Sequence, residues 1–372
     1  MAAPVSSGTA TIAGFAVESA TDGSQWPAIA AAQVTERWPI VSADFDPGMS
    51  QAPVVTRAQT LGPTGVDVVS QAPSVRVAFR WRYQGLDSLL ACALGYMPAA
   101  LPTPLGTTAY RHLYEVSADL EATPWPTADA QPPTTRLVRR GTFAAWRQVS
   151  TWEVLSCMVQ SLALVSDGER VTGAVTLVGA GLSQVSTVNT AAALQALPGC
   201  GWPLLGVRHG RLRLGLASPT TPLSSANDVC YSTCAVRLDN QLAASYGPRT
   251  GLAPEQYGRT TPPALTLTFD TPRYLSDAWL QTWQAQTTLM GELRFLGPQV
   301  GGSGQAYQLT WYLPALRLTD VRPSPVQVGL PSVRHVLQAE VPAQPAAGMP
   351  ATAQPGPVGV EVVSGARHHP LL

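Results

Sequence analysis

The stretch SVRVAFRWRY, residues 74–83, decides the fold, because apolar and polar side chains alternate along it with a period of two. That period is typical of a β-strand with one buried face, and the aromatic residues at its end predict a large core. The stretch ALTLTFD, residues 264–270, repeats the pattern. Phe79 superposes on Phe269 at an offset of 269 − 79 = 190 residues. The chain therefore carries at least one strand twice.

A second pair of stretches repeats in the same order. LSCMVQSLAL, residues 155–164, aligns with LTWYLPALRL, residues 309–318, at an offset of 309 − 155 = 154. Both copies shift their alternation at the same place. The first copy would then hold 190 − 154 = 36 more residues ahead of this strand, which is tolerable because longer loops cost little closure entropy. Two copies of one design favour a protein that builds by repetition over one with a single asymmetric active site.

The punctuation between these strands predicts the domain organisation. Leu86–Leu94 has helical spacing and Gly95 stands where a C-terminal cap belongs, while Gly- and Pro-rich runs predict long loops at 39–66 and 241–263. We predict a mainly β fold of two tandem β-sandwich or barrel modules, each with a short flanking α-helix. The modules are 1–184 and 207–343, joined by a linker at 185–206 and followed by an extended Pro/Gly/Ala-rich arm at 344–372.

Composition narrows the class of protein. Charged residues make up only 12% of the 372 residues, and 23 basic residues balance 23 acidic ones, which leaves no basic footprint for nucleic acid. Every basic residue is Arg, which indicates either interface ion pairs or simply a GC-rich genome. Five scattered Cys do not form a disulfide framework, and no signal peptide or long apolar run is present. We expect a soluble protein made in a reducing cytoplasm.

Motifs that carry chemistry are incomplete. Gly179-Ala180-Gly181 lacks the third glycine of a dinucleotide loop, and Gly301–Gly304 is followed by Gln305, which does not fit a nucleophile elbow. Cys230 and Cys234, with His209 upstream, have no second pair at zinc-site spacing, so a shared core face is the expected role. His335 lies at an inward strand position, and Glu115 and Asp119 have no special spacing. We predict no catalytic, cofactor-binding or metal residues, and no enzyme.

The tryptophans divide into two groups. Trp81, Trp279, Trp283 and Trp311 lie at positions with core periodicity, so we expect them in the interior. Trp26, Trp125 and Trp202 each neighbour a proline and are candidate interface anchors.

The order of elements resembles the major tail tube protein of long-tailed siphophages. Three stretches carry the resemblance: Ser74–Gly95 as strand and flanking helix, Arg111–Leu182 as sheet-completing strands, and Tyr307–Val341 as the closing hairpin of a second copy. The match covers most of residues 70–341 and is one of pattern. The commonest family form has one module per chain, whereas this chain would have two.

The resemblance implies a structural virion protein of the phage tail, made in the host bacterial cytoplasm. Three chains would form a ring with pseudo-sixfold symmetry, and rings would stack head to tail around a tape-measure protein and meet terminator and tip proteins. DNA would pass through the lumen without specific binding. The two long loops are candidate ring-to-ring contacts, and Val358–Val363 is a candidate strand for an adjacent ring. The alternatives are a tandem β-sandwich adhesin or other virion binding module and, less favoured, an unrecognised enzyme.

Overall fold

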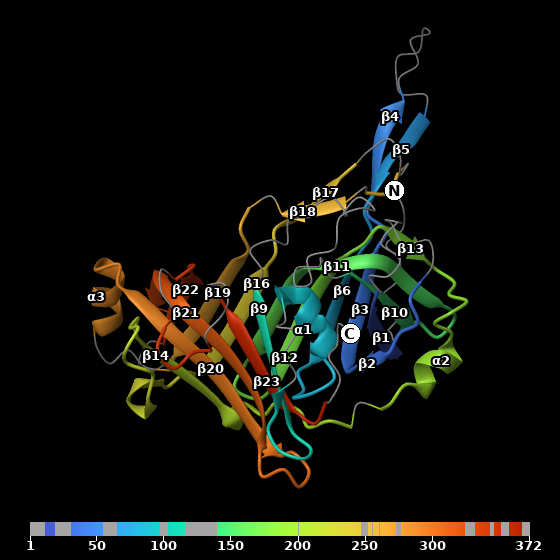
Figure 1. Ribbon diagram of the computed structural model, residues 1–372. Coiled ribbons are helices and arrows are strands. Elements are labelled where there is room, and N and C mark those ends of the chain that lie inside the picture. The colour runs from blue at the N-terminus through green and yellow to red at the C-terminus, as the bar shows by residue number, and fades with distance from the viewer. Residues whose placement is uncertain are drawn as a thin grey trace, which may run out of the picture.

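The computed structural model (Figure 1) describes residues 12–18, 31–54, 65–96, 103–116, 140–199, 201–246, 252–254, 256–259, 261–272, 277–323, 332–342, 346–350 and 357–366. Its first-half strands are β1 (Ile12–Val17), β2 (Glu36–Trp38), β3 (Ile40–Asp46), β4 (Met49–Val54), β5 (Gly65–Gln71), β6 (Ser74–Arg80), β7 (Gly95–Tyr96), β8 (Thr103–Pro104), β9 (Tyr110–Val116), β10 (Gly141–Trp146), β11 (Thr151–Ser166), β12 (Val171–Val178) and β13 (Gly181–Ser183). The later strands are β14 (Gly210–Leu216), β15 (Asp228–Val229), β16 (Thr233–Asp239), β17 (Leu242–Ser245), β18 (Gln256–Arg259), β19 (Ala264–Thr271), β20 (Thr288–Gln299), β21 (Ala306–Pro323), β22 (Val333–Ala339) and β23 (Gly359–Ser364). The helices are α1 (Asp87–Leu94), α2 (Ala191–Ala196) and α3 (Ala278–Gln284). The fold is mainly β, as the alternation predicts.

Eight strands form one antiparallel sheet in the order β3-β6-β12-β11-β16-β19-β22-β21. In Figure 1 this eight-stranded sheet runs across the molecule from β21 and β22 at the left to β3 at the right. One face carries core residues such as Val77 and Phe79, whereas the neighbouring Arg76 and Arg80 are exposed on the other face. The period-two alternation of residues 74–80 thus does set which face is buried.

The two longest strands, β11 and β21, each belong to two sheets. The first part of β11 pairs with β10 and β13, and its second part pairs with β12 and β16. Ser156, where φ is 46°, and a register shift between Val159 and Ser161 separate the two parts. Strands that pass from one sheet to another commonly do so through such irregularities. β21 likewise pairs with β20 and β23 first and with β22 later.

The strand pairing itself occurs twice. The first half pairs in the order β1-β10-β11-β12-β6-β3, and the second in the order β14-β20-β21-β22-β19-β16. A helix follows β6 and β19 in each half, and a two-stranded hairpin precedes each of these strands. The repetition therefore extends from sequence pattern to topology.

The alignment of the long strands at an offset of 154 is wrong in register. Leu162 lies opposite Val175, which lies opposite Val77. Leu318 lies opposite Leu337, which lies opposite Leu267, the counterpart of Val77. Leu162 therefore corresponds to Leu318, whereas the sequence alignment had matched it to Leu316. Both strands contain Leu-x-Leu steps, so a period-two pattern matches equally well at a neighbouring repeat.

One hydrophobic cluster contains buried residues of both halves. In the first half Trp38 stacks on Phe15, with ring centroids 5.2 Å apart, and also contacts Phe79. Trp81 meets Trp311 edge to face at 6.4 Å, which joins the two halves through their largest side chains. Trp81 and Trp311 are fully buried, as their periodicity predicts, and Trp279 packs partly buried against the cluster.

The helices follow their local sequence signals. α1 ends at Gly95, whose φ of 87° is favourable for glycine and whose N–H donates to the carbonyl of Ala91. All eight residues of α1 are buried, against β11, β9 and β1. In α3, Trp279 packs on Phe269 at 5.5 Å. Trp283 is 37% exposed, and its indole N–H donates to the Thr319 carbonyl, so it is not the interior residue that its spacing predicts.

The predicted loop at 39–66 is wrong where β3 and β4 lie within it. The predicted loop at 241–263 contains the two short strands β17 and β18. β4 pairs with β5 and β17 with β18, so each stretch is built around a separate hairpin. The composition of Asp44, Asp46, Pro47 and Gly48 predicts a loop. In the structure, Asp44 and Asp46 lie on the exposed face of β3, and Gly48 forms the turn that follows.

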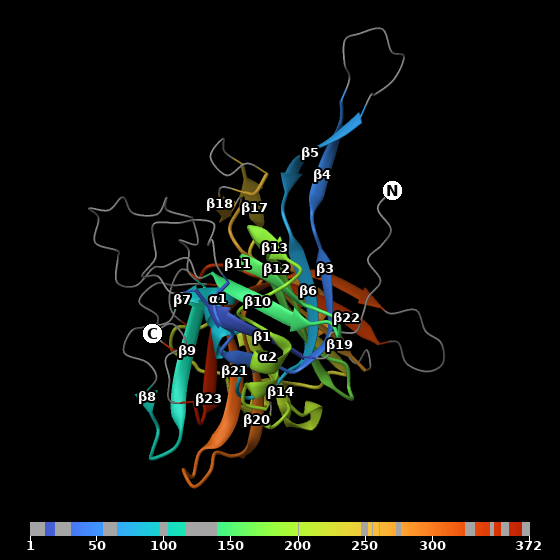
Figure 2. The same cartoon turned by 90° about the vertical axis from the view of Figure 1, so that its right-hand side faces the viewer.

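The expected C-terminal strand pairs within its own chain, which corrects its assignment to an adjacent ring. β23 lies between β21 and β9, and every residue of β23 is buried. Figure 2 shows β9 and β23 side by side. Because β9 belongs to the first half and β21 to the second, β23 ties the two halves together.

The predicted linker at 185–206 contains the short helix α2, with Thr190 as its N-cap. Its Leu194 packs with Val34 and Ala144 in a small buried cluster. The amide of buried Asn189 donates to the carbonyl of Ala32 at 2.9 Å and to Glu153 at 2.6 Å. This segment is therefore fixed on the first half.

Candidate assembly interface

The two halves of the eight-stranded sheet meet where β11 pairs with β16. The pairing is antiparallel and runs from Ser161 opposite Asp239 to Ser166 opposite Cys234. On the core face, Leu162 and Leu164 face Leu238 and Val236, and all four side chains are buried. This internal joint needs no connecting helix or loop between the two strands, because backbone pairing and apolar packing hold it.

Asn240 closes the end of the internal joint. Its backbone N–H donates to the carbonyl of Gln160 at 2.8 Å. Its side-chain amide donates to the carbonyls of Ala93 and Val159, each at 2.9 Å, and its oxygen accepts from Arg259. Since a buried amide is stable only when its polar atoms are bonded, this residue fixes the end of α1 to both joined strands.

Two strand edges remain open among the described residues. β3 pairs with β6 on one side, and no described strand lies along its other side. Residues 318–323 of β21 pair with β22 on one side and likewise have no described strand on the other. An open edge offers unpaired N–H and C=O groups to another strand. These two edges lie at opposite ends of the eight-stranded sheet.

The open edges correspond to the two strands of the internal joint. By the repeated pairing, β3 occupies in the first half the place that β16 occupies in the second. The second part of β21 likewise occupies the place of the second part of β11. The chain thus contains one completed joint, and each end of its eight-stranded sheet carries one strand of a second, unmatched joint.

The exposed face of the eight-stranded sheet carries balanced charge. Cross-strand partners place five aspartates and six arginines on it: Asp44, Asp46, Asp239, Asp270, Asp320, Arg76, Arg80, Arg237, Arg317, Arg322 and Arg334. Asp44 lies opposite Arg76, and Asp270 bonds Arg334 at 2.9 Å, which lowers the pKa of Asp270. The positions between them are mostly Ser, Thr, Ala and Val. No single sign of charge dominates this face.

Two hairpins project from the same end of the molecule. The β4–β5 hairpin extends furthest, and the β17–β18 hairpin lies beside its base in both views (Figures 1 and 2). The backbone N–H of Gln71 donates to the carbonyl of Leu252 at 2.7 Å, which links the base of one hairpin to the loop of the other. Neither hairpin pairs with the eight-stranded sheet.

The glycine-rich candidates have structural roles. Gly179 follows β12, where an added Cβ would lie 2.3 Å from Val154 Cγ1, so the glycine permits close packing. Its carbonyl accepts a hydrogen bond from the Tyr257 hydroxyl. Gly301–Gly304 form the turn between β20 and β21, where Gly302 and Gly304 have φ of 71°. Neither segment opens a helix that could hold phosphate.

The cysteine and histidine candidates are not brought together. Cys234 is buried in β16, and burial raises the pKa of its thiol to about 12. Cys230 is exposed before that strand begins, so the expected shared face is wrong for it. His209 lies in a short 3-10 turn. Among the described residues no group of three or more His, Cys, Asp or Glu could hold a metal ion.

The remaining candidates are core residues or lie outside the described part. His335 stacks on Phe269 at 4.6 Å, and burial lowers its pKa to about 4, so it is a neutral core residue as predicted. Glu115 is buried, which raises its pKa to about 7, whereas Asp119 lies outside the described residues. Trp202 is 38% exposed, and Trp26 and Trp125 lie outside the described residues.

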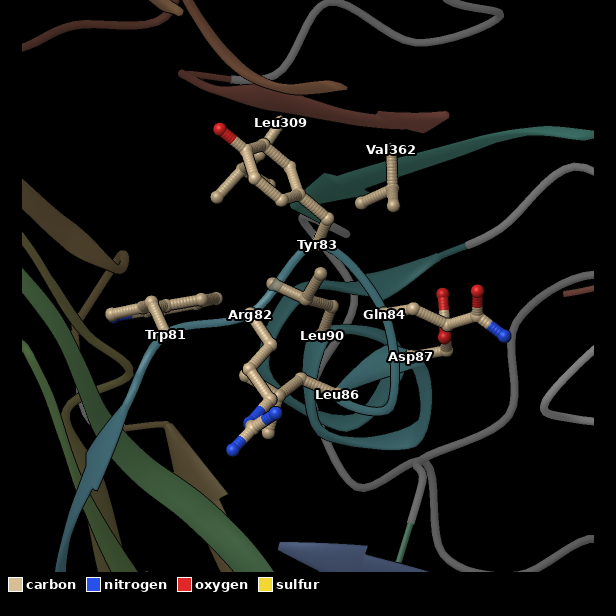
Figure 3. Close-up of a pocket in the computed structure, with 9 residues that line it drawn as sticks. All are labelled: Trp81, Arg82, Tyr83, Gln84, Leu86, Asp87, Leu90, Leu309 and Val362. Carbon is tan, nitrogen blue, oxygen red and sulfur yellow. The ribbon is translucent and has the colours of Figure 1, made fainter. Parts of the chain in front are cut away.

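A small cavity lies where the end of β6, α1, β21 and β23 meet (Figure 3). Its volume is about 10 Å³, room for about one water molecule. The lining residues are Trp81, Arg82, Tyr83, Gln84, Leu86, Asp87, Leu90, Leu309 and Val362. The cavity is far too small for an organic substrate, so it is a packing gap between the halves.

Two acids near α1, buried Asp87 and half-buried Glu36, had no signal in the sequence. The Tyr114 hydroxyl donates to Asp87 at 2.9 Å, and the backbone N–H of Ser88 donates to Glu36 at 3.3 Å. Burial and the nearby Asp87 raise the pKa of Glu36 to about 7. Only tertiary packing brings these groups together from β2, α1 and β9.

The sequence also missed both open edges. The polar composition of β3 predicts a loop, and the pattern around residues 318–323 predicts only part of a hairpin. The repeated hydrophobic pattern reports which residues face the core, and it carries no information on whether a strand has a second neighbour. None of the described helices is long and apolar enough to cross a membrane. No protein-family model and no curated protein matches this chain.

Proposed function

We propose that this chain is a structural virion protein that forms stacked rings, which together make the phage tail tube. One observation carries the proposal: the chain holds one completed strand joint and leaves the two matching halves of a second joint open at opposite ends. A contact between different surfaces of identical chains closes into a ring or grows into a helix. Because the two open edges correspond to the two strands of the internal joint, the same joint can be repeated between chains.

Three chains are the number that we favour. Each contributes eight strands, so a ring of three has 3 × 8 = 24 strands in one closed barrel. With strands about 4.8 Å apart and tilted by about 40°, such a barrel is about 48 Å across between backbones. That width leaves room for a DNA double helix. The resemblance to tail tube proteins, which usually have six positions in a ring, leads to the same number.

The exposed face of the eight-stranded sheet would line this lumen. Its five aspartates and six arginines nearly cancel, and its remaining side chains are mostly small. Clustered arginines would bind phosphate strongly, whereas alternating signs do not. Such a lining suits passage of DNA without specific binding. The two hairpins at one end are the proposed contacts to the next ring, in place of the predicted loops.

The test is microscopy and mass measurement of the purified chain. After concentration and warming, negative-stain images are expected to show tubes with a central channel. Native mass spectrometry of the smallest assembly is expected to give three chains, 3 × 39.2 = 117.6 kDa. A chain that remains monomeric under these conditions would overturn the proposal. Saturable glycan binding by such a monomer would support the adhesin alternative instead.

A further inference from the structure

We propose that β3 of one copy pairs with residues 318–323 of β21 of the next copy, antiparallel and in the register of the internal joint. This inference rests on the proposed ring and names the partner of each open edge as a second copy of the chain. It goes further than the ring, because it fixes which residues lie opposite each other.

β3 is the counterpart of β16 in the repeat. Phe79 lies opposite Ile40, and its counterpart Phe269 lies opposite Cys234. After the irregularity at Val41, each residue of β3 again has a counterpart in β16. Ser42 corresponds to Ala235, Ala43 to Val236, Asp44 to Arg237, Phe45 to Leu238 and Asp46 to Asp239. Each residue of β3 therefore has a defined counterpart in the internal joint.

The second part of β21 is the counterpart of the second part of β11. Thr176 lies opposite Ser161, and its counterpart Gln338 lies opposite Arg317. The same comparison matches Leu318 to Leu162, Asp320 to Ala163, Val321 to Leu164 and Arg322 to Val165, with Thr319 as the extra residue of a register shift. These counterparts follow from the strand pairing in the structure. The sequence offset of 154 would give different ones.

Together, these counterparts give the register between copies. In the internal joint, Ser161 faces Asp239, Leu162 faces Leu238 and Val165 faces Ala235. In the joint between copies, Leu318 therefore faces Phe45 and Arg322 faces Ser42 of the next copy, whereas Arg317 is already paired with Thr288 of β20 on that side. Val321 faces Ala43 in the same way.

The side chains suit this register. Phe45 and Val321 are partly exposed in the single chain, although their counterparts Leu238 and Leu164 are fully buried in the internal joint. Pairing would cover them with apolar neighbours. On the polar face, Arg317 keeps its pairing with Thr288 and its ion pair with Glu340, and Arg322 would lie opposite Ser42 of the next copy.

One like-charge pair is compensated. Asp320 would lie opposite Asp44 of the next copy, but Arg322 already bonds Asp320 at 2.5 Å. In the proposed register Arg322 is also the diagonal neighbour of that Asp44, within reach of a long side chain. A β3–β3 contact between two copies, by contrast, would bring the aspartates of β3 together without an arginine on either strand.

Cysteine crosslinking tests the register. The background carries Cys230→Ser, because that thiol is exposed, and Cys200→Ser. The test pair is Ser42→Cys with Arg322→Cys, and a second pair, Phe45→Cys with Leu318→Cys, lies on the other side of the register shift. The matched internal control is Val165→Cys with Ala235→Cys, the equivalent pair within one chain. Ser42→Cys alone detects a β3–β3 contact.

A register control is Asp44→Cys with Arg322→Cys. Residues directly opposite in an antiparallel pair have Cα atoms about 4.5–5.5 Å apart, within disulfide range, whereas diagonal neighbours are about 7–8 Å apart and exceed it. After warming and mild oxidation, non-reducing gels are expected to show covalent species of two and three chains for both test pairs. The internal control should remain one chain, and the register control should crosslink at least tenfold less.

The outcomes separate the register from the function. Tubes in the microscope with no crosslink from either test pair overturn the proposed joint and leave the tube function standing. A crosslink from Ser42→Cys alone, or one as strong from the register control, also overturns the joint. Crosslinked trimers without tubes support the joint and count against the stacking of rings. A chain that neither crosslinks nor assembles overturns both.

Discussion

At the scale of the residue, Glu36 and Asp87 show how the fold holds acids in a low-polarity site. Both lie near the start of α1, and the Tyr114 hydroxyl and Ser88 N–H bond them. Burial, followed by repulsion from Asp87, raises the pKa of Glu36 from 4.5 to about 7. The folded chain therefore keeps the Glu36 proton between pH 4.5 and pH 7, where the unfolded chain loses it. The free energy of unfolding must fall as pH rises through that window.

Replacing Glu36 by Gln tests this linkage. The amide keeps an acceptor for Ser88 N–H and removes the charge that burial opposes. At pH 8 we expect Glu36→Gln to raise the free energy of unfolding by up to about 3 kcal/mol, from a pKa shift of about 2.5 at 1.36 kcal/mol per unit. At pH 4.5 the difference should be small. Urea unfolding at the two pH values measures it.

The control for this variant is Glu169→Gln, in the exposed turn between β11 and β12. Its effect should be close to zero at both pH values. An effect of Glu36→Gln that is the same at pH 4.5 and pH 8 would show that packing, and not ionisation, is responsible.

Residues at equivalent places also explain why the two cores differ. Gly173 and His335 occupy the same position, opposite Phe79 and Phe269 respectively. A Cβ at Gly173 would lie 2.4 Å from the Phe79 ring, so the first half fills the space with Phe79 and Trp81. The second half fills it with His335, which stacks on Phe269. We expect Gly173→Ala to destabilise the chain by about 1–3 kcal/mol through overpacking, measured by urea unfolding.

The neighbouring Ala174→Ser provides the comparison for Gly173→Ala. Ala174 is exposed on the other face of β12, so its substitution should change stability by less than about 0.5 kcal/mol. Equal losses in both variants would argue against the close contact at Phe79.

At the scale of the element, the two hairpins have the same place in each half but different lengths. β4 and β5 contain six and seven residues, whereas β17 and β18 contain four each. Each hairpin is a separate two-stranded sheet, so its length is free to change without disturbing the eight-stranded sheet. This separation fits a contact element better than a core element.

Removing the longer hairpin tests its role in stacking. We expect replacement of Met49–Gln71 by Asn-Gly to leave ring formation intact, because β3 and β6 keep their pairing with each other. Tubes should be lost or shortened, because the proposed contact to the next ring is gone. Native mass spectrometry reports the rings and electron microscopy the tubes. Tubes of normal length, or the absence of rings, would contradict this role.

The elements also show what a single sequence can predict. α1, its glycine cap and the strands at 74–83, 155–164, 264–270 and 309–318 have strong periodic signals, and their types are confirmed. β3 escaped prediction because an exposed edge strand with Asp44 and Asp46 and a following Pro-Gly turn has the composition of a loop. Its strand state depends on pairing with β6, which the local sequence does not report.

At the scale of the whole molecule, the two halves share one core. Trp81 contacts Trp311, β11 pairs with β16, and β23 lies between β9 and β21. Separation of the halves would expose the fully buried Val360 and Trp311 to water, at a cost of about 25 cal/mol per Å² of apolar surface. The division into two modules thus describes topology and remains a prediction for folding.

The shared core predicts a single unfolding transition of the unassembled chain. Denaturation followed by tryptophan fluorescence and by far-ultraviolet circular dichroism should give coincident curves. Val360→Asp should lower stability strongly in the single chain, because it places a charge at a fully buried position of β23. Val341→Asp, at a residue that is 64% exposed, is the control. Two separated transitions would show that the halves fold independently.

The sequence by itself determined the β class, the faces of the core strands, the helix α1 and its cap, because each depends on neighbours within a few residues. Periodicity of two or 3.6 residues is a local property of the chain. The tertiary structure alone decided the register of the repeat, the strand state of β3, the place of β23 within its own chain and the two open edges. Each of these depends on which distant strand lies alongside, and backbone pairing uses N–H and C=O groups that every residue except proline carries in full. Side-chain pattern therefore indicates that a strand exists, and only the assembled sheet shows which edge remains free.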